Sequence, residues 1–340
     1  MRLLLHVGHG KTGSSFLQSW LSINSSRLLE CENILYPECC PLRGISDSRA
    51  RQGLFSMGNG FVLDPILEGE CPLRRKRRWM RRLIRQASEQ GLQVNKLLFS
   101  SEPWTRRLLP YLPQLYRLLD ELEFDGLDLW LLVRDPLDHA LSVYGEMVKR
   151  HGYYHSLSDW LKTYDFPEVL LRFLRSISNQ SSLMTLRVDH YAKNRRELTT
   201  PLSQWLALTR DVGWASTNSS LLTNRSLTFH ELCLIRWLNE HDPVQAKRVA
   251  ELLVDKLPAE QAKDSNRPSF LKVKHAELQS FVNRWQETVV EINSFLPKES
   301  FLNLDSNHSF LFPKADDIDY KFELSLEQLE CLYEGLTRKA

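Results

Sequence analysis

The chain has 340 residues, of which 42% are hydrophobic and 25% are charged, and its formal net charge is +2. This composition is typical of a folded globular protein and excludes a disordered or low-complexity chain. The net charge is too small to indicate a nucleic-acid binder. No apolar run reaches the roughly 20 residues of a transmembrane helix, and the opening MRLLLHV is too short for the apolar core of a signal peptide. We therefore expect a cytoplasmic protein whose fold begins at residue 1.

The cysteines show neither a C-x-x-C pair nor histidines at zinc spacing, so we interpret them as reduced thiols in a reducing compartment. They stand at positions 31, 39, 40, 71, 233 and 331. No carboxylate cluster suggests a metal site either. We expect a protein that needs no metal.

The first elements alternate between strand and helix. Residues 3–7 form a short apolar run that predicts a central parallel strand, and it ends at Gly8. A helical stripe of apolar residues follows from Ser14 onward. Residues 38–73 are rich in Gly, Pro and Cys and predict an irregular excursion. The next segment, residues 74–91, predicts a helix that is closed by Gly91.

The apolar segments 96–101 and 127–133 predict two further buried strands, and 182–188 a fourth. After residue 150 helical periodicity dominates, most clearly in 227–241 and 275–296. Together these elements predict an α/β fold with a central parallel sheet, flanking helices and a helix-rich C-terminal half. We expect a single domain over residues 1–340, with the motifs below confined to about residues 1–300.

A glycine-rich loop, GHGKTGSS, lies between the first strand and the first helix. Backbone N–H groups in such a loop, together with the helix N-terminus, bind anions, and the lysine and the hydroxyls add charge and donors. We therefore expect a phosphate or sulfate group here; the alternative is a plain glycine turn with an exposed lysine. The residues expected to bind it are Gly10, Lys11, Thr12, Gly13, Ser14 and Ser15.

Two familiar nucleotide loops fit this segment poorly. A Walker A loop needs a glycine at position 5, where Leu5 stands. A dinucleotide fingerprint is met by Gly8, Gly10 and Gly13, but it needs an acidic residue after the next strand, and the acidic residues near that distance precede the apolar segment instead.

A second motif, WLLVRDPLDHALSVYGEM, covers residues 130–147. An apolar strand ends in Arg134, the chain turns at Asp135-Pro136, and Ser142 follows on a helix. Arginine presents a rigid donor fork that matches phosphate oxygens, and the serine can donate from the same side. The alternative is an arginine paired with Asp138 and a serine that faces its own helix.

Both motifs resemble those of the sulfotransferases that use 3′-phosphoadenosine 5′-phosphosulfate (PAPS). The segment HVGHGKTGSSFLQ is similar to the family's 5′-phosphosulfate loop, and Arg134 with Ser142 to its 3′-phosphate motif, Arg-x-Pro-x-Asp-x-x-x-Ser. The resemblance implies a PAPS-binding fold that transfers a sulfuryl group to a hydroxyl or amine. ATP and NAD lack the 3′-phosphate that the second motif would bind.

The chain also departs from relatives in this family. RVDHY stands at 187–191, where many of them have an aromatic–acidic pair, so the adenine contacts are open. The dimerisation signature of the animal cytosolic enzymes is absent, so the oligomeric state is open as well.

Lys11 and Glu102 are the predicted catalytic residues. Lys11 would neutralise the charge that develops on the leaving phosphate, and Glu102, at the end of the second long strand, would take the acceptor's proton. The alternative role of Glu102 is to stabilise a helix N-terminus. The other candidate bases are His9, His139 and His151.

The helix at 74–85 carries a dense run of arginines, which is either a solvated face or a docking surface for an anionic acceptor or an acidic lipid surface. The expected partner is a hydroxylated acceptor, such as a glycan, a lipid or a small metabolite; neither nucleic acid nor a metal is expected. The segments most suited to bind the acceptor, 38–73 and 144–180, match no known pattern. The alternative functions are a nucleotide-dependent P-loop kinase and a non-catalytic PAPS-binding protein.

Overall fold

The computed structural model describes residues 1–37, 39–40, 45–46, 58–63, 67, 73–178, 184–209, 213–216, 226–257, 275–304 and 324–337. Most of the predicted excursion at 38–73 and part of 144–180 lie outside these residues. The chain divides into two compact units: unit 1 comprises 1–134, 168–221 and 291–302, and unit 2 comprises 135–167, 222–290 and 303–340. The single domain expected over 1–340 stays a prediction, and the two units are described separately.

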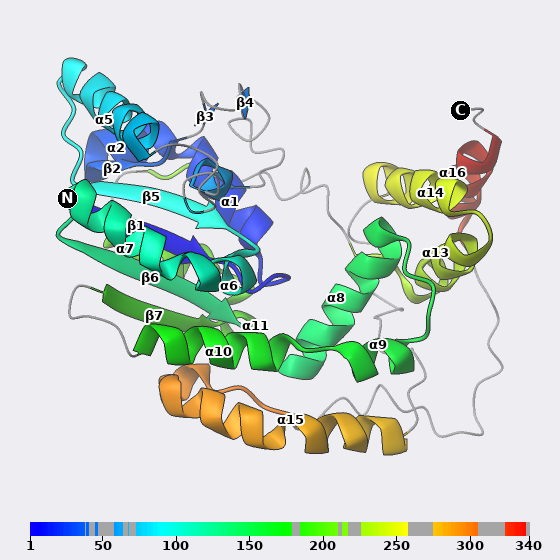
Figure 1. The fold of residues 1–340 in the computed structure, drawn as a ribbon. Coiled ribbons are helices and arrows are strands. Elements are labelled where there is room, and N and C mark those ends of the chain that lie inside the picture. Colours follow the sequence, from blue (N-terminus) through cyan, green and yellow to red (C-terminus); the bar gives the residue numbers. More distant parts are fainter. Residues whose placement is uncertain are drawn as a thin grey trace. The chain divides into compact units, whose positions relative to one another are not determined.

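Unit 1 is an α/β structure built on a five-stranded parallel sheet, as predicted from the sequence (Figure 1). The strand order is β2-β5-β1-β6-β7, and every neighbouring pair is parallel. The strands are β1 (Arg2–Val7), β2 (Ile34–Leu35), β5 (Lys96–Ser101), β6 (Gly126–Val133) and β7 (Met184–His190). A separate antiparallel pair consists of β3 (Cys39–Cys40) and β4 (Ile45–Ser46).

The rest of unit 1 consists mainly of helices in its described part. Unit 1 contains α1 (Ser14–Ile23), α2 (Ser25–Glu32), α5 (Leu73–Glu89), α6 (Trp104–Arg107), α7 (Leu112–Glu121), α11 (Tyr191–Asn194) and α12 (Thr199–Leu206), and most of α10 (Phe166–Ser178). The 3-10 turns among its described residues are η1 (Gly60–Val62), η2 (Leu109–Tyr111) and η7 (Lys298–Ser300). Gly91, with φ 76°, follows the end of α5, and Leu92 N–H bonds the carbonyl of Ala87, so the predicted glycine cap is confirmed.

Unit 2 is helical in its described part. Its helices are α8 (Pro136–His151), α9 (Leu157–Thr163), α13 (Phe229–His241), α14 (Pro243–Lys256), α16 (Leu326–Thr337) and most of α15 (His275–Phe295). Several helix starts have side-chain caps: Thr228 and Glu231 form a reciprocal capping box at α13. No helix among the described residues is both long and apolar enough to cross a membrane.

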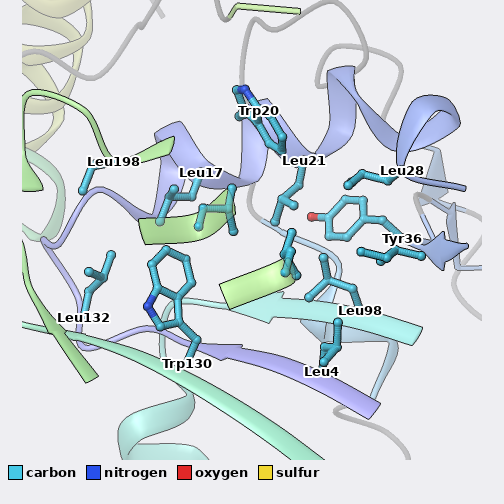
Figure 2. Close-up of a cluster of buried hydrophobic side chains, with 13 residues drawn as sticks. Leu4, Leu17, Trp20, Leu21, Leu28, Tyr36, Leu98, Trp130, Leu132 and Leu198 are labelled. Carbon is cyan, nitrogen blue, oxygen red and sulfur yellow. The ribbon is translucent and has the colours of Figure 1, made fainter. Parts of the chain in front are cut away.

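A buried cluster fixes α1 on the sheet. Leu17 and Leu21 of α1 point down onto Leu4, Leu98 and Trp130 of three strands (Figure 2). Since successive strand residues face opposite sides, Leu4 faces α1 while Leu3 and Leu5 lie in the other half of the core. Full burial of a large apolar side chain stabilises the fold by about 1.5–3 kcal/mol. The packing therefore holds the start of α1, and the loop before it, at the edge of the sheet.

Candidate functional site

The candidate site lies at the carboxyl edge of the sheet in unit 1. The loop 8–13 follows the central strand β1, Glu102 follows β5 and Arg134 follows β6. The chain leaves β1 toward β2 on one side of the sheet, whereas it leaves β6 toward β7 on the other side. Ligands of open α/β sheets bind at such a switch point, beyond the carboxyl ends of the strands.

The loop has an unusual backbone. Gly10, Lys11 and Gly13 have φ angles of 77°, 48° and 83°. Lys11 is the exception among them, because a left-handed conformation is unfavourable for a residue with a Cβ. Left-handed residues in such a turn direct successive N–H groups inward, which makes a concave site for an anion. Leu5 lies inside β1, paired with Phe99 and Leu129, so the Walker A interpretation has no turn at the position where it needs one.

Two of the glycines are required by close approach. A Cβ on Gly8 would lie 2.4 Å from the Cα of Glu102, which is backbone and cannot give way easily. A Cβ on Gly13 would lie 2.4 Å from Cδ1 of Leu198, and the positive φ adds strain for any other residue. The loop is therefore packed directly against the end of β5 and against the segment after β7.

Two hydroxyls at the end of the loop and the start of α1 are buried and have no hydrogen-bond partner in the part of the chain that the structure describes. Thr12 is 0% exposed and Ser14 is 2% exposed. Neither Thr12 Oγ1 nor Ser14 Oγ hydrogen-bonds to any residue that the structure describes. Leaving such a group unsatisfied costs about 1–3 kcal/mol, so a hydroxyl in this state calls for a ligand or a water. Ser15, the third hydroxyl of the motif, is half-buried.

The backbone of Lys11 is held from both sides. Its N–H donates to Oε1 of Glu102 over 3.1 Å, and its carbonyl accepts from Nη1 of Arg134 over 3.0 Å. The structure thus brings together three residues that the sequence placed at the ends of three different strands. The carboxylate of Glu102 sits at a loop N–H, where an anionic ligand would bind.

Arg134 has further packing around its guanidinium. The guanidinium lies over the ring of Tyr191, 5.3 Å from its centroid, and Nε is buried with no hydrogen-bond partner in the described part of the chain. The aromatic ring orients the arginine, and one donor of its fork is left available to a ligand.

Ser142, the other half of the predicted 3′-phosphate motif, lies on α8 in unit 2 and is half-buried. Asp135 precedes this helix, and its Oδ1 accepts from the N–H of Asn303 over 2.7 Å within the same unit. Lys11, Glu102 and Arg134 are therefore assembled within unit 1, and the pairing of Ser142 with Arg134 stays a prediction.

The three candidate histidine bases lie in different surroundings. His9 is buried within the loop, where burial and then the charge of Arg134 lower its pKa to about 4. His139 is buried in unit 2, and its Nδ1 lies 2.8 Å from Tyr164 Oη. His151 is exposed at the end of α8. A base with the pKa of His9 would bind a proton only weakly near neutral pH.

Sequence reasoning missed a polar network beneath the loop. His6 Nδ1 lies 2.8 Å from Ser100 Oγ, which also accepts from Gln18 Nε2 over 3.1 Å. Asn59 accepts from the Ser100 N–H over 2.8 Å. Burial lowers the pKa of His6 to about 4, so the ring is neutral at physiological pH. The available signal was the presence of His6 and Ser100 within otherwise apolar strands.

The segment RVDHY also has a defined place. Asp189 accepts from Trp130 Nε1 over 2.7 Å and from Arg187 Nε over 2.7 Å. Tyr191, the first residue of α11, lies beneath the Arg134 guanidinium. No group of three or more potential metal ligands occurs among the residues whose placement is described.

Comparison with known proteins finds little. No family model and no curated protein matches the chain. Among solved structures, the sulfotransferase domain from the Synechococcus PCC 7002 olefin synthase is similar at 14% identity, over 87% of this chain and 95% of that chain, with a TM-score of 0.33. A similarity this low carries no weight for fold or activity, so the function must be argued from the site itself.

Proposed function

We propose that this protein is a sulfotransferase that moves the sulfuryl group of PAPS to a hydroxyl or amine acceptor. The proposal rests on two sets of hydrogen-bond donors suited to anions, one after β1 and one after β6, on either side of the switch point. On one side are the buried hydroxyls of Thr12 and Ser14, and on the other is Nε of Arg134; none of these three groups has a hydrogen-bond partner among the described residues. Two such sets of donors suit a nucleotide with phosphates on both sides of its ribose.

The residues of the loop would hold the 5′-phosphosulfate, and Arg134 with Ser142 the 3′-phosphate. The nucleotide supplies the sulfuryl group and leaves as adenosine 3′,5′-bisphosphate. Lys11 neutralises the negative charge that grows on the phosphate oxygen as its bond to sulfur breaks. Because the loop is already in its strained shape, little reorganisation is needed.

Glu102 is the proposed base. As the acceptor oxygen or nitrogen bonds to sulfur, the bond from sulfur to the phosphate oxygen breaks and its electron pair leaves with the bisphosphate, while Glu102 takes the acceptor's proton. In the present structure its Oε1 accepts from the Lys11 N–H. An anion in the loop competes for that N–H, so ligand binding releases the carboxylate for proton transfer. This exchange couples nucleotide binding to activation of the base.

Nucleotide selectivity tests this proposal. Adenosine 3′,5′-bisphosphate and AMP differ only in the 3′-phosphate, and a charge-assisted hydrogen bond contributes about 1.5–3 kcal/mol, which is about ten- to a hundredfold in affinity. Calorimetric titration should show that preference in the wild type. Arg134→Ala should remove most of it by weakening bisphosphate binding with little effect on AMP. Arg195→Ala, an exposed arginine after β7, is the control and should keep the preference.

Three results would contradict the proposal. Equal affinity for the bisphosphate and AMP would show that the protein has no binding site for the 3′-phosphate. Tighter binding of ATP than of either would favour a kinase. Bisphosphate binding without any single-turnover transfer from labelled PAPS, across a panel of hydroxylated glycans, lipids and metabolites, would favour a non-catalytic nucleotide-binding protein.

A further inference from the structure

Helix α5 of unit 1, the cyan helix at the upper left of Figure 1, has a basic outer face. Its exposed arginines are Arg74, Arg75, Arg78, Arg81, Arg82 and Arg85. At 100° per residue these positions fall within an arc of about 120°, along roughly 16 Å of helix. We name these six residues the arginine stripe.

The opposite side of α5 is buried. Trp79 is 5% exposed and Met80 is 0% exposed, so both pack into unit 1. Arg77, which lies outside the stripe, donates from Nη2 to the carbonyl of Glu121 over 2.9 Å. The apolar residues that a membrane-inserting helix would push into lipid are thus already used in the core.

Within the described residues, most of the charges of the stripe have no oppositely charged partner. Arg85 pairs with Glu89 over 3.3 Å, with both side chains well exposed. The other five arginines of the stripe form no ion pair with any residue in the described ranges. Like charges gathered on one face repel each other, and this cost falls when an anionic partner approaches.

We propose that the arginine stripe docks the protein on an anionic lipid surface by electrostatic attraction alone. The stripe is the outward face of a single helix and is therefore convex. A convex face cannot enclose a polymer chain from two sides, as grooves and clefts do. It can present all its charges to a flat surface, where fluid anionic headgroups gather beneath them. This inference does not depend on the proposed activity, since the stripe lies outside the loop, Glu102 and Arg134.

Vesicle sedimentation of the full chain tests the inference. Vesicles of phosphatidylcholine with about 30 mol % phosphatidylserine should bind the protein, and vesicles of phosphatidylcholine alone should not. Each arginine near such a surface contributes about fivefold in partitioning, so Arg78→Gln, Arg81→Gln and Arg85→Gln together should weaken binding by about a hundredfold. Because these side chains are exposed and glutamine favours helix, the variant should keep its fold.

The matched control carries Arg117→Gln, Arg172→Gln and Lys298→Gln, which remove the same charge from exposed positions on other elements. It should keep most of the binding. Binding should also vanish as salt rises toward about 1 M, where the screening length is only about 3 Å. Equal binding to both kinds of vesicle, or equal binding by the stripe variant, would overturn the inference. So would tighter, stripe-dependent binding to a soluble sulfated polysaccharide or to duplex DNA at the same charge concentration.

Discussion

The two edges of the sheet in unit 1 use polar residues in opposite ways. At the amino edge, Arg2 donates from Nε to Asp128 Oδ2 over 2.7 Å and also bonds the other carboxylate oxygen, while Thr185 donates to the same group. The Met1 amino group pairs with Asp125. Burial raises the pKa of Asp128, but the hydrogen bonds from Arg2 and Thr185 and the charges of Arg2 and Lys96 outweigh it, so the pKa is lowered.

At the carboxyl edge the buried polar atoms include several without partners in the described part of the chain. Thr12 Oγ1, Ser14 Oγ, Arg134 Nε and His6 Nε2 are all of this kind. The polar groups of the amino edge therefore stabilise the fold by pairing with each other. At the carboxyl edge, a bound ligand could supply the hydrogen bonds that these polar groups lack. Substitutions of paired residues at the amino edge should therefore lower the free energy of unfolding, whereas substitutions of ligand-binding residues at the carboxyl edge should lower ligand affinity.

The largest effect is expected at the carboxyl edge from Glu102→Gln. Loss of a general base typically costs about 10²–10⁴-fold in turnover. Binding of adenosine 3′,5′-bisphosphate should persist or tighten, because glutamine brings no negative charge to the Lys11 N–H. Single-turnover transfer and calorimetry measure the two quantities. A turnover near that of the wild type at saturating acceptor would move the base to another residue, with His9 the nearest candidate.

The response to acid should also distinguish the edges. His6 and His9 have a pKa of about 4 in the folded protein, below the ordinary value of 6.5, so the unfolded chain binds more protons between these values. The free energy of unfolding therefore has its highest value above about pH 6.5. It falls by roughly 3 kcal/mol for each ring as the pH drops toward 4. Asp128, whose ordinary pKa is 3.8, loses its contribution only at lower pH.

Urea unfolding at a series of pH values measures this loss. His9→Asn should remove about half of it, and His151→Asn, at an exposed position, should leave it unchanged. A stability that stays constant between pH 6.5 and 4 would show that the two buried rings do not stay neutral in the folded state.

A smaller effect is expected from Ser14→Ala. If this hydroxyl bonds the phosphosulfate, its loss should weaken bisphosphate binding by about tenfold, near the lower end for a bond to a charged group. The free energy of unfolding without ligand should not fall, because the substitution removes a buried hydroxyl that has no partner among the described residues. Reduced stability with unchanged affinity would place Ser14 with the structural residues.

The smallest effect is expected at the amino edge, from Arg2→Ala. It should lower the free energy of unfolding by about 1–2 kcal/mol, less than for a fully buried pair, because the Arg2 side chain is 38% exposed and solvent screens it. Bisphosphate affinity should stay unchanged. A parallel loss of affinity would mean that the two edges are coupled through β1.

Much of unit 1 could be predicted from the sequence, because apolar runs bounded by glycine and polar residues define buried parallel strands. The four long strands and the helix at 74–91 of unit 1 appear close to their predicted bounds, and so do the helices at 227–241 and 275–296, which lie wholly or mostly in unit 2. The position of the loop and of Arg134 at one edge follows from strand direction alone. Strand order was not predictable, since periodicity shows which face is buried but not which strands are neighbours.

The contacts of individual site residues could not be predicted either. The bond from the Lys11 N–H to Glu102 depends on Gly8 packing against β5, a long-range contact that spacing along the chain does not encode. The placement of Tyr191 under Arg134 depends likewise on β7 pairing with β6. The arginines of α5 were visible at once, but only the burial of Trp79 and Met80 defines which face is outermost.

The central place of β1 has a consequence for how the protein is made. This strand pairs with β5 and β6, so Arg2 meets Lys96 and Gly126 across the sheet. At about 5–20 residues per second, the ribosome needs roughly 5–20 s after β1 to produce its first central neighbour. During that interval an apolar, low-charge strand is without its partners, and such segments favour aggregation. Chaperone binding during synthesis should therefore begin once β1 leaves the ribosome and end only after β5 and β6 have been made.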